Sequence, residues 1–351
     1  MLREIDSELA ARSLREFVCQ AWQVVEPATP FIPGWHLDAI CDHLEAVSSC
    51  QIRNLLINMP PRHMKSLAVS VFWPCWEWIR WPERRWLFSS YAASLSIRDS
   101  LKCRRLIESA WYQAAWGDRF KLAGDQNAKG RFENDKSGYR LATSVGGAAT
   151  GEGGDRIVVD DPHNVNEAES DNVRRGVLDW WGQVMSTRLN DPKTGAKVIV
   201  MQRVHEADLA GHVLEQGGYE HLCLPAEYEG PTRPTSIGWS DPRTDNGELL
   251  WSERFGREEL DALKRALGSY AAAGQLQQRP APAEGGIFKR HWWRYWQWPG
   301  SNLPPVKMHK PNGELDTIYP VDRPAVFDEQ QQSWDMAFKD LKTSDFVCGQ
   351  V

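Results

Sequence analysis

The sequence predicts an α/β protein built on a mostly parallel sheet that is flanked by helices. Three short apolar runs predict buried strands: Asn54–Asn58, Arg156–Asp160 and Lys197–Gln202. Segments with the 3.6-residue apolar period of helices separate these runs, and buried strands that alternate with helices are typical of parallel sheets. Polar or charged residues follow each run, which predicts a binding site at the carboxyl edge of the sheet.

Composition excludes several classes of protein. The chain has 351 residues, of which 42% are hydrophobic, and this length predicts about two domains. A net charge of −6 provides no overall attraction to nucleic acid, so any DNA contact must come from local patches. The seven cysteines form no C-x-x-C pair, which argues against a zinc site or a disulfide framework and favours a reducing cytoplasm. No apolar run approaches the ~20 residues that span a bilayer, so we expect no membrane contact.

The first buried run leads into a candidate phosphate-binding loop. A short strand, a tight loop and a helix start carrying Lys65-Ser66 follow one another, which is the layout of such loops. In them, backbone N–H groups surround the phosphates, the lysine reaches the outer phosphates and the hydroxyl ligates Mg²⁺. Met59 and Met64 stand where the general pattern has glycines. The alternative is therefore an ordinary strand-to-helix turn with a surface lysine.

The second run ends in a pair of carboxylates. Asp160 and Asp161 follow an apolar strand, and hydrolysis of a magnesium nucleotide needs acidic groups at such a position. Asp160 would hold the metal through water, and Asp161 would orient or deprotonate the attacking water. An Asp-Asp-Pro turn is the alternative for these residues alone, but together with Lys65 they favour a nucleotide hydrolase. We expect Lys65 and both carboxylates to meet at adjacent strand tips around one triphosphate.

Three further features bear on the site. Gln202, at the end of the third run, is placed to sense the γ-phosphate and relay hydrolysis to a moving part. Trp35-His36 precedes the loop strand and could lie against an adenine base, although a helix-start packing role fits equally well. Pro74 interrupts the apolar helix that follows Lys65 and predicts a kink there.

The chain divides into four predicted segments. Residues 1–50 form a helical lead-in, and residues 51–265 form the nucleotide-binding domain. Residues 266–300 include the Pro- and Gly-rich stretch Arg279–Gly286, which predicts a linker. Residues 301–351 begin a further sheet that is too short here to complete a domain.

Four motifs together resemble the large terminase subunit of tailed bacteriophages and prophages: Met59–Ser66, Ile157–His163, Met201–Leu209 and Gln277–Pro280. The resemblance implies a P-loop NTPase fold of the RecA/ASCE-like type, followed by the truncated start of an RNase H-like domain. It implies a motor that hydrolyses ATP to ADP and phosphate, with Mg²⁺, and moves viral double-stranded DNA into a procapsid. A metal-dependent endonuclease would be truncated in this chain.

The resemblance also implies roles for individual residues. Lys65 and Ser66 would contact phosphate and Mg²⁺, and Arg62 would reach the phosphates from the same loop. Asp160 would be the metal-side carboxylate, Asp161 the catalytic carboxylate, and Gln202 part of the coupling motif. Pro61, His63 and Met64 would complete the nucleotide loop, and Asp335 would be one metal-binding carboxylate of the nuclease. Met64 replaces a common glycine and is expected to crowd the phosphates.

Partners follow from the same resemblance. We expect double-stranded DNA, a portal protein and the small terminase subunit, with a ring of identical subunits on the portal and a monomer in solution. The compartment would be the cytoplasm of the host bacterium. An arginine reaching a neighbouring subunit's nucleotide has four candidates: Arg98, Arg104, Arg105 and Arg140.

Two alternatives stay open at this point. Another P-loop DNA motor, such as a helicase, should have a second RecA-like half, and no second loop and acidic strand follow Gly211. An inactive prophage remnant that only binds partners is favoured slightly by Met64 and by the short C-terminal segment.

Overall fold

The computed structural model describes residues 2–124, 128–147, 151–281, 293–309, 315–324, 333–335 and 348–350. Two compact units make up the chain, Met1–Ala283 and Glu284–Val351. The boundary between them lies inside the range 266–300 that the sequence predicts as a linker. Among the described residues, no helix combines the length and apolar character needed to cross a membrane.

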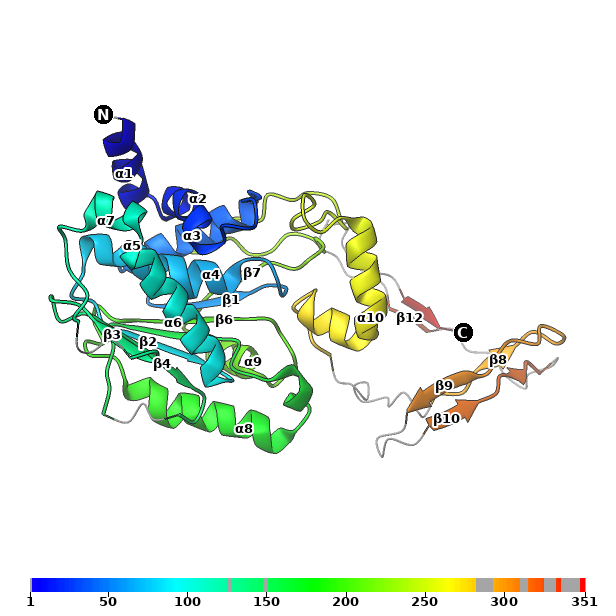
Figure 1. Ribbon diagram of the computed structural model, residues 1–351. Helices are drawn as coiled ribbons and strands as arrows, with labels where there is room; N and C mark the ends of the chain where they lie inside the picture. Colours follow the sequence, from blue (N-terminus) through cyan, green and yellow to red (C-terminus); the bar gives the residue numbers. More distant parts are fainter. Residues whose placement is uncertain are drawn as a thin grey trace. The chain divides into compact units, whose positions relative to one another are not determined.

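The first unit is built on a seven-stranded sheet with the order β3-β4-β2-β5-β6-β1-β7. All neighbouring strands are parallel except β3 and β4, so the carboxyl ends of six strands share one edge (Figure 1). This arrangement confirms the predicted mostly parallel α/β sheet. The strands are β1 (Asn54–Asn58), β2 (Trp86–Ser90), β3 (Arg131–Glu133), β4 (Tyr139–Ser144), β5 (Arg156–Asp160), β6 (Ala196–Met201) and β7 (Glu220–Cys223).

Helices cover both faces of this sheet (Figure 1). One face carries α2 (Leu14–Val25), α3 (Trp35–Ser48), α5 (Trp73–Arg80), α6 (Ala93–Glu108) and α7 (Ala110–Trp116), with α1 (Leu2–Arg12) packed on α2. The other carries α8 (Asp171–Asp179), a π-helical turn (Trp180–Val184), 3₁₀ turns (Val165–Glu167 and Met185–Thr187) and α9 (Leu209–Gln216). Successive strand residues point to opposite faces, so the sheet separates two cores.

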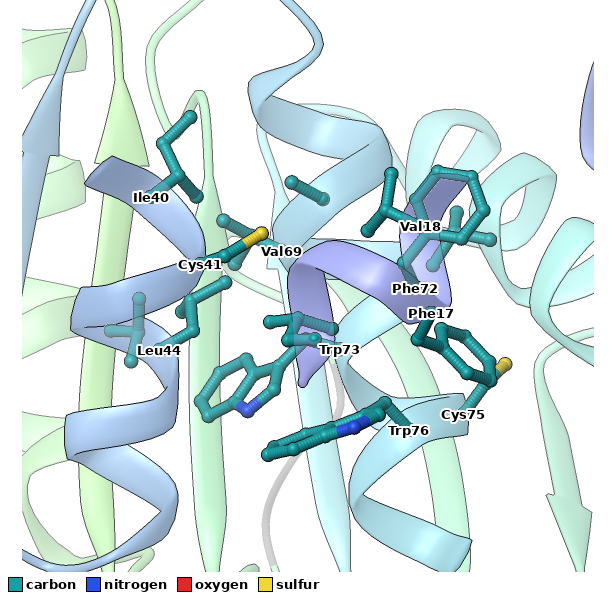
Figure 2. Close-up of a cluster of buried hydrophobic side chains, with 14 of the residues drawn as sticks. Phe17, Val18, Ile40, Cys41, Leu44, Val69, Phe72, Trp73, Cys75 and Trp76 are labelled. Atoms are coloured by element: carbon teal, nitrogen blue, oxygen red, sulfur yellow. The ribbon is translucent and has the colours of Figure 1, made fainter. Parts of the chain in front are cut away.

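The larger core shows why the apolar helices pack where they do. Phe17 of α2, Leu44 of α3 and Trp73 of α5 meet over the sheet (Figure 2). Leu55 and Ile57 of β1 belong to this core, whereas Leu56 belongs to the smaller one beneath α8 and α9. A strand buried on both faces has no polar positions to alternate, which explains the continuous apolar run that identified β1.

Two helical segments are divided into shorter elements. Ser13 separates α1 from α2, because Ser13 is extended and its side chain accepts the Glu16 N–H as an N-cap. After the loop, α4 (Lys65–Leu67), a π-helical stretch (Ala68–Phe72) and α5 follow one another without a gap. The π-helical stretch ends two residues before Pro74, whose missing N–H and bulky ring disfavour regular α geometry in the preceding turn.

Helix α10 (Arg257–Gln275) is the last helix among the described residues of the first unit, and Gly268 interrupts it at φ 74° and ψ 165°. In the second unit, β8 (Trp296–Gln297) pairs with β11 (Val321–Asp322), and β9 (Val306–His309) pairs with β10 (Leu315–Ile318). Strand β12 (Ser333–Asp335) pairs antiparallel with β13 (Cys348–Gln350). The RNase H-like fold stays a prediction, and the side chain of Asp335 lies outside the described residues.

Candidate functional site

A cavity of about 630 Å³ opens at the carboxyl edge of the sheet, beside the loop that follows β1. The ends of β2, β5 and β6 and one side of α6 form its other walls. Eight predicted site residues line it: Pro61, Arg62, Met64, Lys65, Ser66, Asp160, Asp161 and Gln202. The structure therefore brings the loop, both carboxylates and the glutamine to one place.

The loop itself has the backbone shape of an anion site. Arg62 and Met64 take the left-handed conformation, with φ of 66° and 67°, and left-handed residues in such loops turn successive N–H groups toward one point. Among the described residues, no acceptor takes the N–H groups of residues 62–66. The helical run that starts at Lys65 adds the partial positive charge of its N-terminus. Phosphate oxygens suit this concave set of donors.

Lys65 and Asp161 form the centre of the site. Lys65 Nζ lies 2.9 Å from Asp161 Oδ2, although the lysine side chain is only 5% exposed. Asp161 has φ of 43°, and its Oδ1 accepts the backbone N–H of Gln202 at 3.0 Å. One carboxylate thus links the loop after β1 to the ends of β5 and β6.

The predicted adjacency of the strand tips is wrong. Strand β6 lies between β1 and β5 in the sheet, so the strands that carry the loop and the carboxylates are not neighbours. The groups still meet because the loop after β1 reaches across the end of β6, and one strand occupies only about 4.8 Å of sheet width. Sequence patterns place each strand but carry no signal for this insertion.

Asp160 is held by two hydroxyls of the helical run. Ser66 Oγ donates to its Oδ1 and Ser70 Oγ to its Oδ2, each at 3.1 Å. Burial, and then the charge of Asp161, raise the pKa of Asp160 to about 7. The sequence analysis missed Ser70, although its position four residues after Ser66 on one helix predicts a shared face.

These oxygens fit a magnesium ion that is bound together with a nucleotide. Ser66 Oγ and the Asp160 carboxylate are the hard oxygen ligands that Mg²⁺ prefers. The described residues contain no group of three His, Cys, Asp or Glu side chains suited to a metal ion. A metal here would therefore complete its shell with phosphate oxygens and water, as Mg²⁺ commonly does.

Several buried polar atoms on the cavity wall have no partner among the described residues. They are Ser89 Oγ, His163 Nδ1, Gln202 Oε1 and the three guanidinium nitrogens of Arg140. Buried polar groups in folded proteins are nearly always satisfied, often by water or a ligand. Their concentration around one cavity indicates a site for a polar ligand.

Arg140 is not a candidate for reaching a neighbouring subunit. Its side chain is 0% exposed, and its guanidinium lies 3.5 Å from the centre of the Phe88 ring. Arg98 lines the cavity and makes two hydrogen bonds to Asp99. Arg104 pairs with Glu108, and Arg105 is exposed on α6.

The structure does not bring Trp35, His36 or the His63 side chain into the cavity. His36 is 0% exposed, with Trp251 at 4.7 Å and His63 at 5.9 Å between ring centres. Trp35 stacks on Trp239. Burial lowers the pKa of His36 to about 3 and that of His63 to about 4, so both imidazoles are neutral at pH 7.

Arg254 is a further cavity residue that sequence reasoning missed. Its guanidinium lies over the rings of Trp251 and Phe255, at 5.1 and 5.7 Å. Phe255 in turn stacks on His63 of the loop at 4.7 Å. These aromatic contacts hold a positive charge beside the phosphate loop, a placement that depends on packing and has no motif in the sequence.

Comparison of the sequence with family models and with curated proteins finds no match. The fold is similar to solved structures of bacteriophage large terminases. The HK97 large terminase shares 9% identity at a TM-score of 0.49, over 88% of this chain and 67% of that chain. The large terminase of the thermophilic bacteriophage D6E in complex with ADP shares 8% at a TM-score of 0.41, over 66% of this chain and 52% of that one.

An ATPase-domain variant of the Thermus phage P74-26 large terminase shares 13% identity at a TM-score of 0.41, over 72% of this chain and 95% of that chain. The chain thus spans about half the length of the D6E protein. Values this low describe a likeness in the arrangement of elements and carry nothing about individual residues.

Proposed function

We propose that the first unit is the ATPase of a phage or prophage large terminase and that it hydrolyses ATP to ADP and phosphate with Mg²⁺. One observation carries the proposal. Lys65 lies 2.9 Å from Asp161, and Ser66 lies 3.1 Å from Asp160, at the carboxyl edge of a parallel sheet. This is the set of groups that phosphoryl transfer to water requires, in one place.

Each residue has a definable task. The free N–H groups of residues 62–66 and the Lys65 ammonium bind the β- and γ-phosphates. Ser66 and Asp160 hold the metal, which when bound withdraws charge from the phosphate oxygens. Asp161 accepts a hydrogen bond from the attacking water and orients it. Gln202 lines the same cavity, its Oε1 has no partner among the described residues, and it is placed to sense the γ-phosphate.

Charge at the cavity supports a polyphosphate substrate. Arg62 and Arg254 line it beside Lys65. Arg98 and Lys102 line it as well, but they pair with Asp99 and Glu26. Cationic groups around a low-dielectric cleft raise the local concentration of an anionic substrate. Arg254 is fixed by its aromatic neighbours and needs little reordering to contact a phosphate.

The wider role rests on the four sequence motifs that resemble large terminases. We propose that ATP hydrolysis here moves double-stranded DNA into a procapsid, in a ring of identical subunits on a portal, with a small terminase subunit as partner. The setting is the host bacterial cytoplasm. We also propose Asp335, in β12, as a metal-binding carboxylate of the nuclease.

The test is a steady-state ATPase assay with Mg²⁺ on the full chain, alone and with DNA. Wild type should hydrolyse ATP, slowly as a monomer because a neighbour's arginine can contribute about 10³-fold or more. Lys65→Ala should lose nucleotide binding and turnover, whereas the control Lys136→Ala, whose lysine is exposed and pairs with Asp135, should match wild type. A wild type that neither binds nor hydrolyses ATP, even with DNA and portal, defeats the proposal and leaves the inactive prophage remnant.

A further inference from the structure

In the loop that leaves β6, the backbone N–H groups donate to side chains. Residues 202–205 follow the last strand residue, Met201, and their four backbone N–H groups bond neither to a strand nor to a helix. Gln202 N–H donates to Asp161 Oδ1 and Arg203 N–H to Gln278 Oε1, each at 3.0 Å. The Val204 and His205 N–H groups both donate to Asp208 Oδ2, at 3.0 and 3.3 Å.

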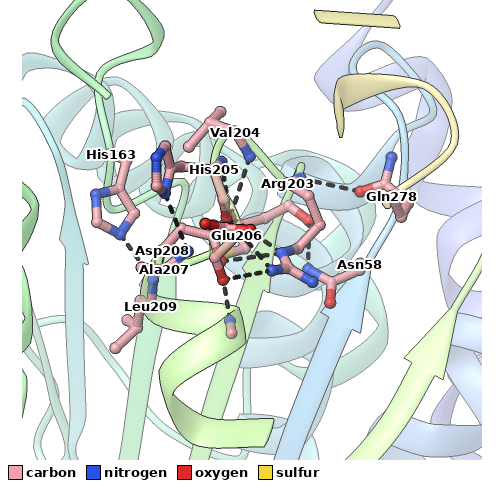
Figure 3. A network of polar contacts seen from close by, with 12 residues as sticks. Asn58, His163, Arg203, Val204, His205, Glu206, Ala207, Asp208, Leu209 and Gln278 are labelled. Carbon is pink, nitrogen blue, oxygen red and sulfur yellow. Dashed lines mark hydrogen bonds and ion pairs between the residues drawn. The ribbon is translucent and has the colours of Figure 1, made fainter. Parts of the chain in front are cut away.

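Of these three acceptors, Gln278 is the one that lies far away in the sequence and outside the nucleotide site. Asp208 is local: it caps α9 through the Gly211 N–H and binds the Arg203 guanidinium. Asp161 belongs to the catalytic pair. Gln278 lies 75 residues further along the chain, just after α10, and Figure 3 shows it reaching the network from a separate segment.

Gln278 is itself firmly anchored. Its side chain is 5% exposed, and its Nε2 donates to the carbonyl of Gln275 at 2.6 Å. Its backbone has φ of 57°, a conformation that is costly for a residue with a side chain and persists only where the surroundings enforce it. The close approach continues at Gly274, where an added Cβ would lie 3.1 Å from the Arg203 carbonyl oxygen.

These contacts form a continuous path from the hydrolysis site. Asp161 binds Lys65 through one oxygen and the Gln202 N–H through the other. The adjacent N–H, that of Arg203, is bound by Gln278. A displacement of the Gln202 backbone therefore either breaks the bond to Gln278 or moves the end of α10, from which the chain continues to the unit boundary after Ala283.

We propose that Gln278 is a positioning residue for Gln202: it fixes the loop after β6 so that Gln202 faces the γ-phosphate, and it ties that loop to the segment leaving the first unit. This inference rests on the proposed ATPase function. It assigns a task to a residue that touches neither nucleotide nor metal. Without Gln278 the Arg203 N–H loses its acceptor in a buried place, which is unfavourable, and the loop relaxes.

The neighbouring Gln277 provides a matched control. It is 8% exposed, and its amide also makes two hydrogen bonds to backbone, accepting from Glu227 N–H at 3.0 Å and donating to the Glu227 carbonyl at 3.1 Å. It stabilises the same end of α10 without contacting the loop after β6. Gln278→Met and Gln277→Met each keep the side-chain length and remove both amide contacts.

The experiment measures ATP turnover, ADP affinity and thermal stability of the full-length variants. Gln278→Met should lower kcat about tenfold, while KM for ATP and the Kd for ADP stay within about twofold. Gln277→Met should lose comparable thermal stability and keep kcat within about twofold of wild type. Equal losses of kcat in both variants, or an unchanged kcat in Gln278→Met, overturn the proposal and reduce Gln278 to a helix-end contact.

Amide hydrogen exchange separates this inference from the proposed function. The Arg203 amide should exchange faster in Gln278→Met than in wild type and Gln277→Met, whether or not the protein hydrolyses ATP. If wild type proves inactive, the ATPase proposal fails. The exchange rate of the Arg203 amide then tests by itself whether Gln278 holds the loop after β6. If the Arg203 amide stays protected in Gln278→Met, Gln278 does not hold this loop and the inference is overturned.

Discussion

Replacing Asp161 by asparagine should separate nucleotide binding from hydrolysis. In the structure the Lys65 ammonium is occupied by Asp161, at 2.9 Å, so an incoming triphosphate must compete for it. At this separation and an effective dielectric constant of about 20, the Coulomb attraction is about 6 kcal/mol. Desolvation of the two charges offsets most of that attraction. We expect the net attraction between Lys65 and Asp161 to be about 1.4 kcal/mol, which corresponds to about tenfold in the affinity for ATP.

Asp161→Asn keeps the shape of the side chain, removes the competing charge and removes the group that orients water. We therefore expect about tenfold tighter binding of ATP and a loss of turnover of about 10²- to 10⁴-fold, the usual contribution of such a base. Titration calorimetry with a non-hydrolysable analogue and single-turnover hydrolysis measure the two effects separately.

The control lies at the other end of the same strand. Asp155 precedes β5, and its carboxylate accepts the Arg85 N–H at 2.8 Å and the Asn190 amide at 3.1 Å. Asp155→Asn should leave affinity and turnover unchanged. If Asp161→Asn binds ATP more weakly than wild type, or still hydrolyses it at the wild-type rate, the assignment of the Lys65–Asp161 pair is refuted.

Three further predictions concern stability. Met64→Gly relieves about 1–2 kcal/mol of left-handed strain at φ 67° but removes a buried side chain worth about 2–5 kcal/mol. The free energy of unfolding, measured by urea denaturation, should therefore fall, and a rise contradicts this balance. Burial lowers the pKa of His36 to about 3 and of His63 to about 4, so the unfolded chain takes up protons first as pH falls below about 6.5. The free energy of unfolding should then fall by up to about 1.4 kcal/mol per pH unit for each histidine down to about pH 4, and a flat profile between pH 7 and 5 would count against it. Arg156→Met should cost about 3–5 kcal/mol, because Arg156 and Glu77 form a 2.8 Å ion pair with both side chains 0% exposed. Adding Glu77→Leu should recover most of the loss, and a single variant as stable as wild type would disprove the role of the pair.

The sequence by itself determined the elements that carry the site. Strands β1, β5 and β6 are nearly uninterrupted apolar runs because both of their faces are buried. Asp160-Asp161 lie at the end of β5, and Lys65-Ser66 follow β1 after a short loop, so a parallel sheet places them at one edge wherever the strands lie within it. Edge strand β3 escaped prediction because it is short and only partly buried.

Only the tertiary structure decided what these local signals leave open. The insertion of β6 between β1 and β5, the burial of Arg140 on Phe88, the packing of His36 against Trp251 and the bond from Arg203 to Gln278 each join segments that are far apart in sequence. Local periodicity reports which face of an element is buried, but not which partner covers it. That choice depends on the simultaneous packing of all elements, which is settled by the whole fold.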